Sequence, residues 1–284
     1  MSVLVLGLTL ATGAGSASAQ SVGVPTYGAG SVVNVVRQQG LDQWAVTDVD
    51  DFFKGSSMVS TANLIVGAGS EGNSVVYRSG AMHRVTARAA YTGDEAAAQG
   101  TGALAMAGNR AWGMSLGFEA GPLVLRLAHQ NRAVAGAAPL TSMGNTLEAK
   151  NSIVAANVRL GVATAYAAYS VSRGHTSAPL WNPDNPYSVA LASTPSNKSR
   201  DMLVGVALPL GGATMLASFI RKNDRDVANH DTNQLALGAT CAVARRTDVY
   251  LAYSRISNRN SAYPSAHASS GGGAAVNIGM RHGF

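Results

Sequence analysis

Two short glycine-containing motifs have the spacing of sites that carry chemistry in enzymes. Residues 113–117 read G-x-S-x-G, a pattern that presents a nucleophilic serine on a sharp strand-to-helix turn. Ser115, however, lies between large apolar residues at Met114 and Leu116, which predicts the middle of a strand. Residues 67–72 read G-x-G-x-x-G, the dinucleotide-binding pattern, but they precede a strand-like segment and open no helix. We therefore expect no catalytic residue and no cofactor, and predict that the protein is not an enzyme.

The residue types that bind metals or form covalent bonds are sparse. The single cysteine, Cys241, excludes a disulfide within the chain, and it alternates in step with Leu237 and Ala239. The six histidines show no ligand spacing such as H-x-x-x-H. The sequence therefore predicts no metal site.

The charge content points away from a water-soluble domain. Only 13% of residues are charged, about half the usual share, while 46% are hydrophobic. A protein this poor in charge leaves much of its surface away from water. The net charge is +6, but the arginines are scattered singly, so we expect no nucleic-acid partner.

The elements that carry these residues have the period of β-strands. From about residue 73 onward, segments of 8–12 residues alternate between apolar and small or polar side chains, which predicts eleven strands up to the C-terminus. Residues 27–37 are a candidate twelfth strand. Short and long connections alternate, and aromatic residues lie near the strand ends. This combination is typical of an all-β fold, an antiparallel transmembrane β-barrel with a polar lumen.

Single arginines fall on the small-residue face of the predicted strands. A charge on the lipid face costs about 2–4 kcal/mol near mid-membrane, which favours the lumen for these side chains. Two interpretations stay open: the arginines set ion selectivity, or they are solvated lumen residues near the rims. The pore-lining candidates are Arg78, Arg84, Arg88, Arg126 and Arg159.

The N-terminal segment has the features of an export signal. A short apolar stretch is followed by Ala17-Ser18-Ala19, an A-x-A cleavage pattern, which predicts a signal peptide over residues 1–19. The apolar run is shorter than the roughly 20 residues of a membrane helix.

Several stretches also resemble the Gram-negative general porins, in particular the beta-proteobacterial branch. The matching stretches are "NSVVYRSG", "DMLVGVALPLGGATMLASF", "LALGATCAVARRTDVYLAYSRISN" and the closing "NIGMRHGF". The resemblance implies a sixteen-stranded, trimeric outer-membrane barrel, of which residues 73–284 supply the last eleven strands and the N-terminal part is shortened. It also implies that residues 48–72, within an atypical region 20–72, form the constricting loop. The acidic residues of that loop are Asp48, Asp50, Asp51 and Glu71.

The resemblance implies a function without a reaction. We expect a water-filled channel for passive diffusion of small hydrophilic solutes and ions. The excess of basic residues favours a weak preference for anions. The alternative is a non-conducting or truncated outer-membrane barrel with a structural or surface role. The expected partners are small polar solutes, ions, outer-membrane lipid, two further copies of the chain and the outer-membrane assembly machinery. In the resembled family a terminal aromatic residue, here Phe284, is the assembly signal, and the protein reaches the outer membrane through the periplasm.

Overall fold

The computed structural model describes residues 6–8, 32–39, 70–79, 84–92, 110–134, 147–178, 196–227, 229, 231–258 and 273–282. Within these ranges the chain forms thirteen strands: β1 (Leu6–Leu8), β2 (Val32–Gln39), β3 (Ser70–Arg78), β4 (Val85–Thr92), β5 (Arg110–Ala120), β6 (Leu123–Val134), β7 (Leu147–Arg159), β8 (Thr164–Ala178), β9 (Ser196–Leu210), β10 (Ala213–Asp224), β11 (Thr232–Ala244), β12 (Thr247–Asn258) and β13 (Gly273–His282). The described part contains no apolar helix of membrane-spanning length.

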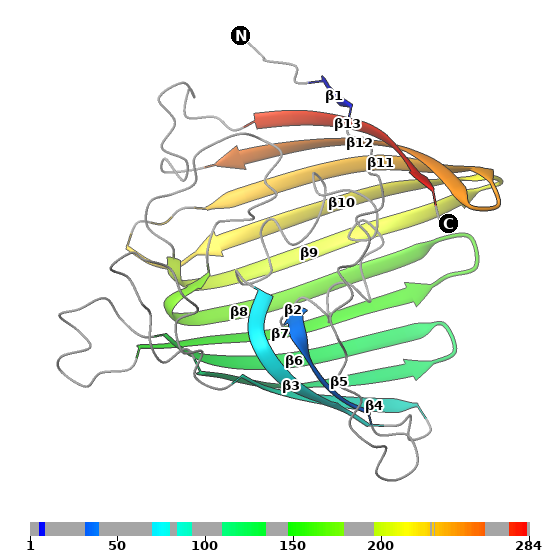
Figure 1. Ribbon diagram of the computed structural model, residues 1–284. Coiled ribbons are helices and arrows are strands. Elements are labelled where there is room, and N and C mark those ends of the chain that lie inside the picture. The colour runs from blue at the N-terminus through cyan, green and yellow to red at the C-terminus, as the bar shows by residue number, and fades with distance from the viewer. Residues whose placement is uncertain are drawn as a thin grey trace.

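All thirteen strands belong to one sheet with a simple order. Strands β2 to β13 follow one another as antiparallel neighbours, and β1 adds to β13 in parallel through Leu6–Leu8 and Val276–Ile278. The sheet curves strongly, so that β2 and β3 turn back in front of the central strands (Figure 1). Among the described residues, β2 and β13 are not paired with each other, so the sheet does not close and forms a partial barrel. The all-β antiparallel fold predicted from the sequence is confirmed.

The strand count from the alternation is also confirmed. Strands β3 to β13 are the eleven predicted strands, and they run from Ser70 to His282. The candidate twelfth strand at residues 27–37 exists as β2, shifted to Val32–Gln39, and pairs with β3. Of the segment predicted as a signal peptide, only Leu6–Leu8 lies within the described residues, as β1.

Tight turns join the strands at one end of the sheet. Gly121 and Gly211 have positive φ values of 56° and 63°, a conformation that residues with a Cβ rarely adopt, and they reverse the chain between β5 and β6 and between β9 and β10. Arg245 and Arg246 form the turn between β11 and β12. These turns lie together on the right of Figure 1. The connections at the opposite end span more residues, as the sequence predicts, and lie mostly outside the described residues.

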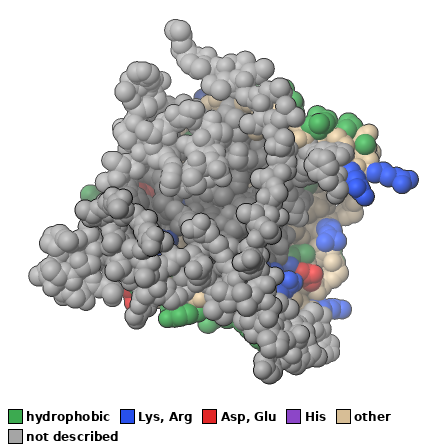
Figure 2. All heavy atoms as spheres, in the orientation of Figure 1, with side chains coloured by type: hydrophobic (Ala, Val, Ile, Leu, Met, Phe, Trp, Pro, Cys, Tyr) green, Lys and Arg blue, Asp and Glu red, His purple; other side chains and the backbone are tan. Residues whose placement is uncertain are grey.

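The two faces of the sheet are inverted relative to a water-soluble protein. Large apolar side chains on the convex outer face are exposed, for example Met114 at 55% and Leu251 at 48%. Many polar side chains on the inner face are buried, for example Lys222 and Gln234, which are at most 1% exposed. Green apolar side chains accordingly reach the edges of the molecule in Figure 2. An outer face of this kind is stable against lipid and unfavourable in water.

The inner face is less uniformly polar than the sequence predicts. Leu203 of β9 pairs with Ile220 of β10, and both are fully buried. Ile256 of β12 lies in the same row of the inner face, opposite Gln234. The alternation alone assigns small or polar residues to this face, so these apolar residues were not expected there.

Two glycines on the inner face make room for tyrosine rings. Tyr166 of β8 lies opposite Gly205 of β9, and its hydroxyl donates a hydrogen bond to the carbonyl of Ala217 at 3.3 Å. A Cβ at Gly205 would overlap the Tyr166 ring, and a Cβ at Gly279 would overlap the ring of Tyr250 in the same way. Each ring therefore covers the backbone of the neighbouring strand, a cross-strand pairing that fixes the register.

We predict that Gly205→Ala destabilises the folded barrel. The added methyl group displaces the buried Tyr166 ring, and overpacking of this kind costs about 1–3 kcal/mol. Urea unfolding of the protein in detergent or lipid, followed by tryptophan fluorescence, measures the effect. Gly212→Ala is the matched control, because a Cβ at this turn position meets nothing within 4 Å. Equal stability of the two variants would contradict this packing role.

Candidate functional site

Cationic side chains gather on the inner face of β3 to β6. Arg78 of β3 is the direct cross-strand partner of Arg88 of β4, and Arg88 in turn faces Ser115 of β5. Arg78 is exposed and Arg88 is half-buried. Since partners in register lie on the same face of a sheet, the two guanidinium groups share the inner wall. The sequence predicts that both point to the lumen, and the register places them on one face of the sheet.

Arg126 lies on the same inner face, two residues closer to the tight turns than Arg88, and several contacts hold its side chain. It pairs with Gly117 of β5, whose missing side chain leaves room for the guanidinium, since a Cβ there would lie 2.9 Å from Nη1. Its Nη2 forms an ion pair with Oε1 of Glu119, and Nη1 donates a hydrogen bond to the carbonyl of Leu125 at 3.3 Å. The Arg126 side chain is only 7% exposed, whereas Glu119 is 62% exposed. Arg126 therefore contributes to wall structure more than to contact with solutes.

Two more of the predicted arginines lie at the end with the tight turns. Arg84 precedes β4 and is exposed, and its carbonyl accepts a hydrogen bond from the backbone N–H of Glu119 at 2.9 Å. Arg159 is the last residue of β7, is exposed, and pairs with Thr164 across the turn. The structure thus places four of the five predicted arginines in one region over β3 to β6, with Arg159 at the turn after β7.

The predicted acidic partners are not brought together with these arginines in the described structure. Asp48, Asp50 and Asp51 lie outside the described residues, as does Phe284. Glu71 lies in β3, where its backbone pairs with Gln38 of β2, so residues 70–72 of the expected constricting loop belong to a strand. Among the described residues, Glu119 contacts the arginine region through its ion pair with Arg126.

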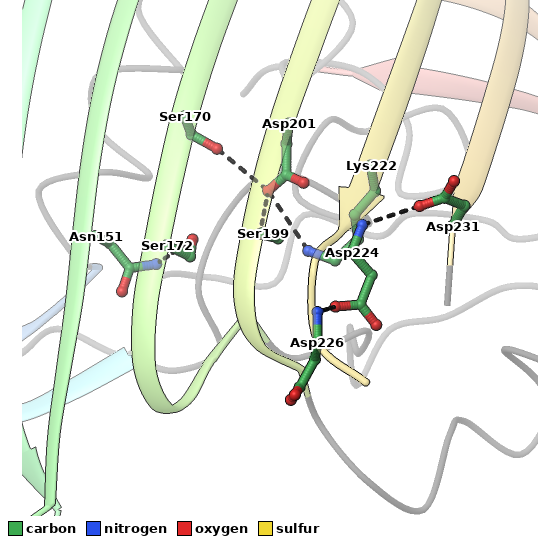
Figure 3. A network of polar contacts seen from close by, with 9 residues as sticks. All are labelled: Asn151, Ser170, Ser172, Ser199, Asp201, Lys222, Asp224, Asp226 and Asp231. Carbon is green, nitrogen blue, oxygen red and sulfur yellow. Dashed lines mark hydrogen bonds and ion pairs between the residues drawn. The ribbon is translucent and has the colours of Figure 1, made fainter. Parts of the chain in front are cut away.

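A second polar cluster joins β8, β9 and β10 at the end with the longer connections (Figure 3). Asp201 of β9 lies directly opposite Ser170 of β8 and Lys222 of β10. Its Oδ2 is 3.5 Å from Nζ of Lys222 and accepts hydrogen bonds from the Ser199 and Ser170 hydroxyls at 2.9 and 3.3 Å. The Asp201 and Lys222 side chains are at most 2% exposed.

This cluster holds strands together and does not present charge to a passing solute. Two buried ions pay a large desolvation cost, and the pair is tolerated because each ion compensates the other and the serines supply further hydrogen bonds. Two residues beyond Ser170, further from the tight turns, Ser172 Oγ accepts a hydrogen bond from Asn151 Nδ2 at 3.1 Å. The polar contacts therefore continue across β7 and β8. The cluster therefore fixes the register of β8 to β10.

Hydrogen bonds from backbone N–H groups to carboxylates also fix the connection between β10 and β11. Asp224 is buried, and its Oδ1 accepts a hydrogen bond from the backbone N–H of Asp226 at 2.9 Å. The Oδ1 of Asp231 accepts one from the backbone N–H of Asp224 at 3.1 Å (Figure 3). Carboxylates that accept from nearby backbone N–H groups stabilise turns of this kind.

The enzyme-like motif has no catalytic geometry in the described structure. Ser115 lies in the middle of β5, as its alternation predicts, and is 2% exposed. His129 of β6 contacts a different serine: its Nδ1 lies 2.8 Å from the Ser152 hydroxyl on the outer face. Among the described residues, no group of three His, Cys, Asp or Glu side chains is placed to hold a metal ion.

The buried ion pair was not expected from the sequence, although the sequence contains a signal for it. Gly211 and Gly212 form a two-residue turn, and counting back equally along both strands places Asp201 opposite Lys222. Arg132 was not expected on the inner face either; it pairs with Ala111 and so lies there with Arg88 and Arg126. The period-two pattern of β6 would have placed it there.

Comparison with known proteins decides the family. The family model described as Gram-negative porin matches residues 34–261. The chain belongs to the Gram-negative porin family. A search of curated proteins finds no match.

Three solved structures share the fold of this porin. An anion-selective porin from Comamonas acidovorans has a TM-score of 0.57 at 18% identity, over 80% of this chain and 66% of its own. OmpF of Salmonella typhi, solved in complex with daunomycin, has a TM-score of 0.61 at 16% identity, over 88% and 74%. A loop-deleted OmpT of Vibrio cholerae, an outer membrane protein, has a TM-score of 0.58 at 14% identity, over 89% and 76%. This chain thus spans 66–76% of their lengths.

The family and the fold support an outer-membrane location and a channel for passive diffusion. They do not favour the alternative of a barrel with only a structural role. The faces described above agree with this, because an exposed apolar outer face and a charged inner face are the arrangement of a channel in lipid.

We predict that Lys222→Met strongly destabilises the porin. Removing the ammonium leaves the Asp201 carboxylate buried without its counter-ion, which costs about 3–5 kcal/mol. Urea unfolding in lipid vesicles measures the loss. The double variant Asp201→Asn/Lys222→Met should recover most of it, because neither charge is then buried.

Lys150→Met is the control for this experiment. It breaks the ion pair of Lys150 Nζ with Glu148 Oε2 at 2.6 Å, in which both side chains are about half exposed. An exposed pair contributes at most about 1 kcal/mol. Similar losses for Lys222→Met and Lys150→Met would refute a structural role for the buried pair.

Proposed function

We propose that this porin forms a water-filled channel in the outer membrane, through which small hydrophilic solutes and ions diffuse passively. The single observation that carries the proposal is the inversion of the two faces within a porin sheet, with exposed apolar side chains outside and charged side chains inside. Lipid covers the first face, and water and solutes occupy the space beside the second. The proposal includes no catalytic step and no cofactor.

We further propose a weak preference for anions. Arg78 and Arg88 are adjacent on the inner wall and accessible, and Arg84 lies nearer the tight turns. Glu119 of β5 forms an ion pair with Arg126 on the same wall. A wall with accessible cations lowers the energy of an anion in the channel and raises that of a cation. The anion selectivity of the structurally similar Comamonas porin is consistent with this proposal.

The family resemblance supports three finer proposals about assembly. We propose that the porin is exported through the periplasm, that it assembles as a trimer, and that the assembly machinery reads Phe284. Cross-linking in outer-membrane preparations tests the trimer, because a protomer that gives no cross-linked species under conditions that trap a control trimer would refute it.

We predict that Arg78→Gln/Arg88→Gln shifts the ion preference of the channel towards cations. The reversal potential in a planar bilayer with a KCl gradient measures this preference, and liposome swelling with small sugars shows independently that the pore is open. The wild-type protein should swell liposomes and give a reversal potential on the anion side. The double variant should move the potential towards the cation side, because two positive charges leave the wall.

The matched control is Arg173→Gln/Arg200→Gln, at two exposed residues that alternate in step with the outer-face residues Tyr169 of β8 and Met202 of β9. It removes two charges from the outer face and should leave the reversal potential unchanged. Swelling that is absent for correctly inserted wild-type protein would favour the structural alternative over the channel. A cation-side potential for the wild type, with normal swelling, would refute only the anion preference.

A further inference from the structure

One acidic side chain shares the cationic inner wall at the end with the tight turns. Strands β4 to β7 contain two acidic residues, Glu119 of β5 and Glu148 of β7. Glu119 is on the inner face, because it alternates in step with Gly117, the cross-strand partner of Arg126. Glu148 is on the outer face, because its neighbour Ala149 is buried on the inner face. Within these four strands, Glu119 is therefore the inner-face carboxylate.

Cations surround Glu119 on this wall. Its backbone N–H donates a hydrogen bond to the carbonyl of Arg84 at 2.9 Å, so the two residues are cross-strand neighbours on the same face. Its Oε1 forms the ion pair with Nη2 of Arg126. On the inner face from Arg84 to β7, the described structure places five arginines against this one carboxylate: Arg84, Arg88, Arg126, Arg132 and Arg159. This part of the wall is therefore cationic with or without Glu119, and the carboxylate changes the size of the charge effect but not its sign.

The two members of the ion pair differ in exposure. The Arg126 side chain is 7% exposed and lies over Gly117, whereas Glu119 is 62% exposed. An ion that passes the end with the tight turns therefore comes closer to the carboxylate than to the guanidinium behind it. Since the Coulomb energy falls with distance, the pair acts on such an ion with the sign of its exposed member.

We propose that Glu119 is a specificity-determining residue of the channel. Its exposed carboxylate attracts cations and repels anions at the end with the tight turns, and it thereby weakens the anion preference that Arg78, Arg84 and Arg88 produce. This role rests on the proposed channel function, but it does not require the wild-type protein to prefer anions, because removing a negative charge from the wall shifts any channel towards anions.

The competing explanation is that Glu119 only holds Arg126 against the wall. A glutamine distinguishes the two roles, because its amide oxygen can accept the same hydrogen bond from Nη2 of Arg126 but carries no charge. Glu119→Gln therefore keeps the contact and removes the negative charge.

The test measures the reversal potential of Glu119→Gln and of the wild-type protein in planar bilayers with KCl gradients. We expect the ratio of chloride to potassium permeability to rise about twofold near 0.1 M salt, because one exposed unit charge acts in opposite directions on the two ions and is partly screened. At about 1 M salt the Debye length falls to about 3 Å, and the difference between the two proteins should nearly vanish. Liposome swelling with small neutral sugars should be unchanged, since the two side chains have the same size.

Two matched variants isolate the charge at this position. Glu119→Asp keeps the carboxylate and should give the wild-type reversal potential. Glu148→Gln removes the same charge from the outer face, where Glu148 pairs with Lys150, and should also give the wild-type reversal potential.

The outcomes separate the role of Glu119 from the channel function. With normal swelling, an unchanged potential for Glu119→Gln would overturn the selectivity role and leave the channel in place. So would an equal shift for Glu148→Gln, a glutamine-like shift for Glu119→Asp, or a shift that persists undiminished at high salt. Swelling that is absent for correctly inserted wild-type protein would instead refute the channel, and the selectivity role with it.

Discussion

The whole structure depends on the pairing of backbone hydrogen bonds across one continuous sheet. Hydrocarbon offers no partner for an N–H or carbonyl group, so each strand in a membrane must satisfy its backbone through its neighbours. Strands β3 to β12 each have an antiparallel partner on both sides, and β13 pairs with β12 and with β1. Once the backbone is satisfied in this way, the period of two decides which side chains meet lipid and which face inward. The inverted burial of Met114 and Lys222 follows from this arrangement.

The inner wall adds the interactions that fix the register of the strands. In a barrel the large apolar residues contact lipid, so they contribute little to the choice between one register and another. The Tyr166–Gly205 and Tyr250–Gly279 pairs and the buried Asp201–Lys222 pair are specific to a single alignment. A shift by one residue would move Asp201 to the lipid face, at a cost of several kcal/mol, so the buried pair also acts against misalignment.

Much of the fold, and part of the site, could be predicted from the sequence. Alternation alone gives the strands, their antiparallel order and the inner position of Arg78, Arg88 and Arg126, because a strand has only two faces. It fails where two strands must be aligned, as for Asp201 and Lys222, or where apolar residues such as Ile220 face inward. It also ends strands too early. Residues 196–200, Ser-Asn-Lys-Ser-Arg, show no apolar alternation, yet they continue β9 beyond the exposed apolar residues of the outer face.

The inversion of the two faces is tested most directly at Cys241. This residue is exposed on the outer face of β11, and its neighbour Thr240 lies on the inner face. A fluorophore is attached to Cys241, or to Thr240→Cys in a Cys241→Ser background, and the labelled protein is placed in vesicles of lipids brominated on their acyl chains. If the two faces are inverted, the brominated chains quench the label at position 241 strongly, and aqueous iodide is the main quencher of the label at position 240. Equal quenching at the two positions, or the reverse order, would contradict the inversion of the faces.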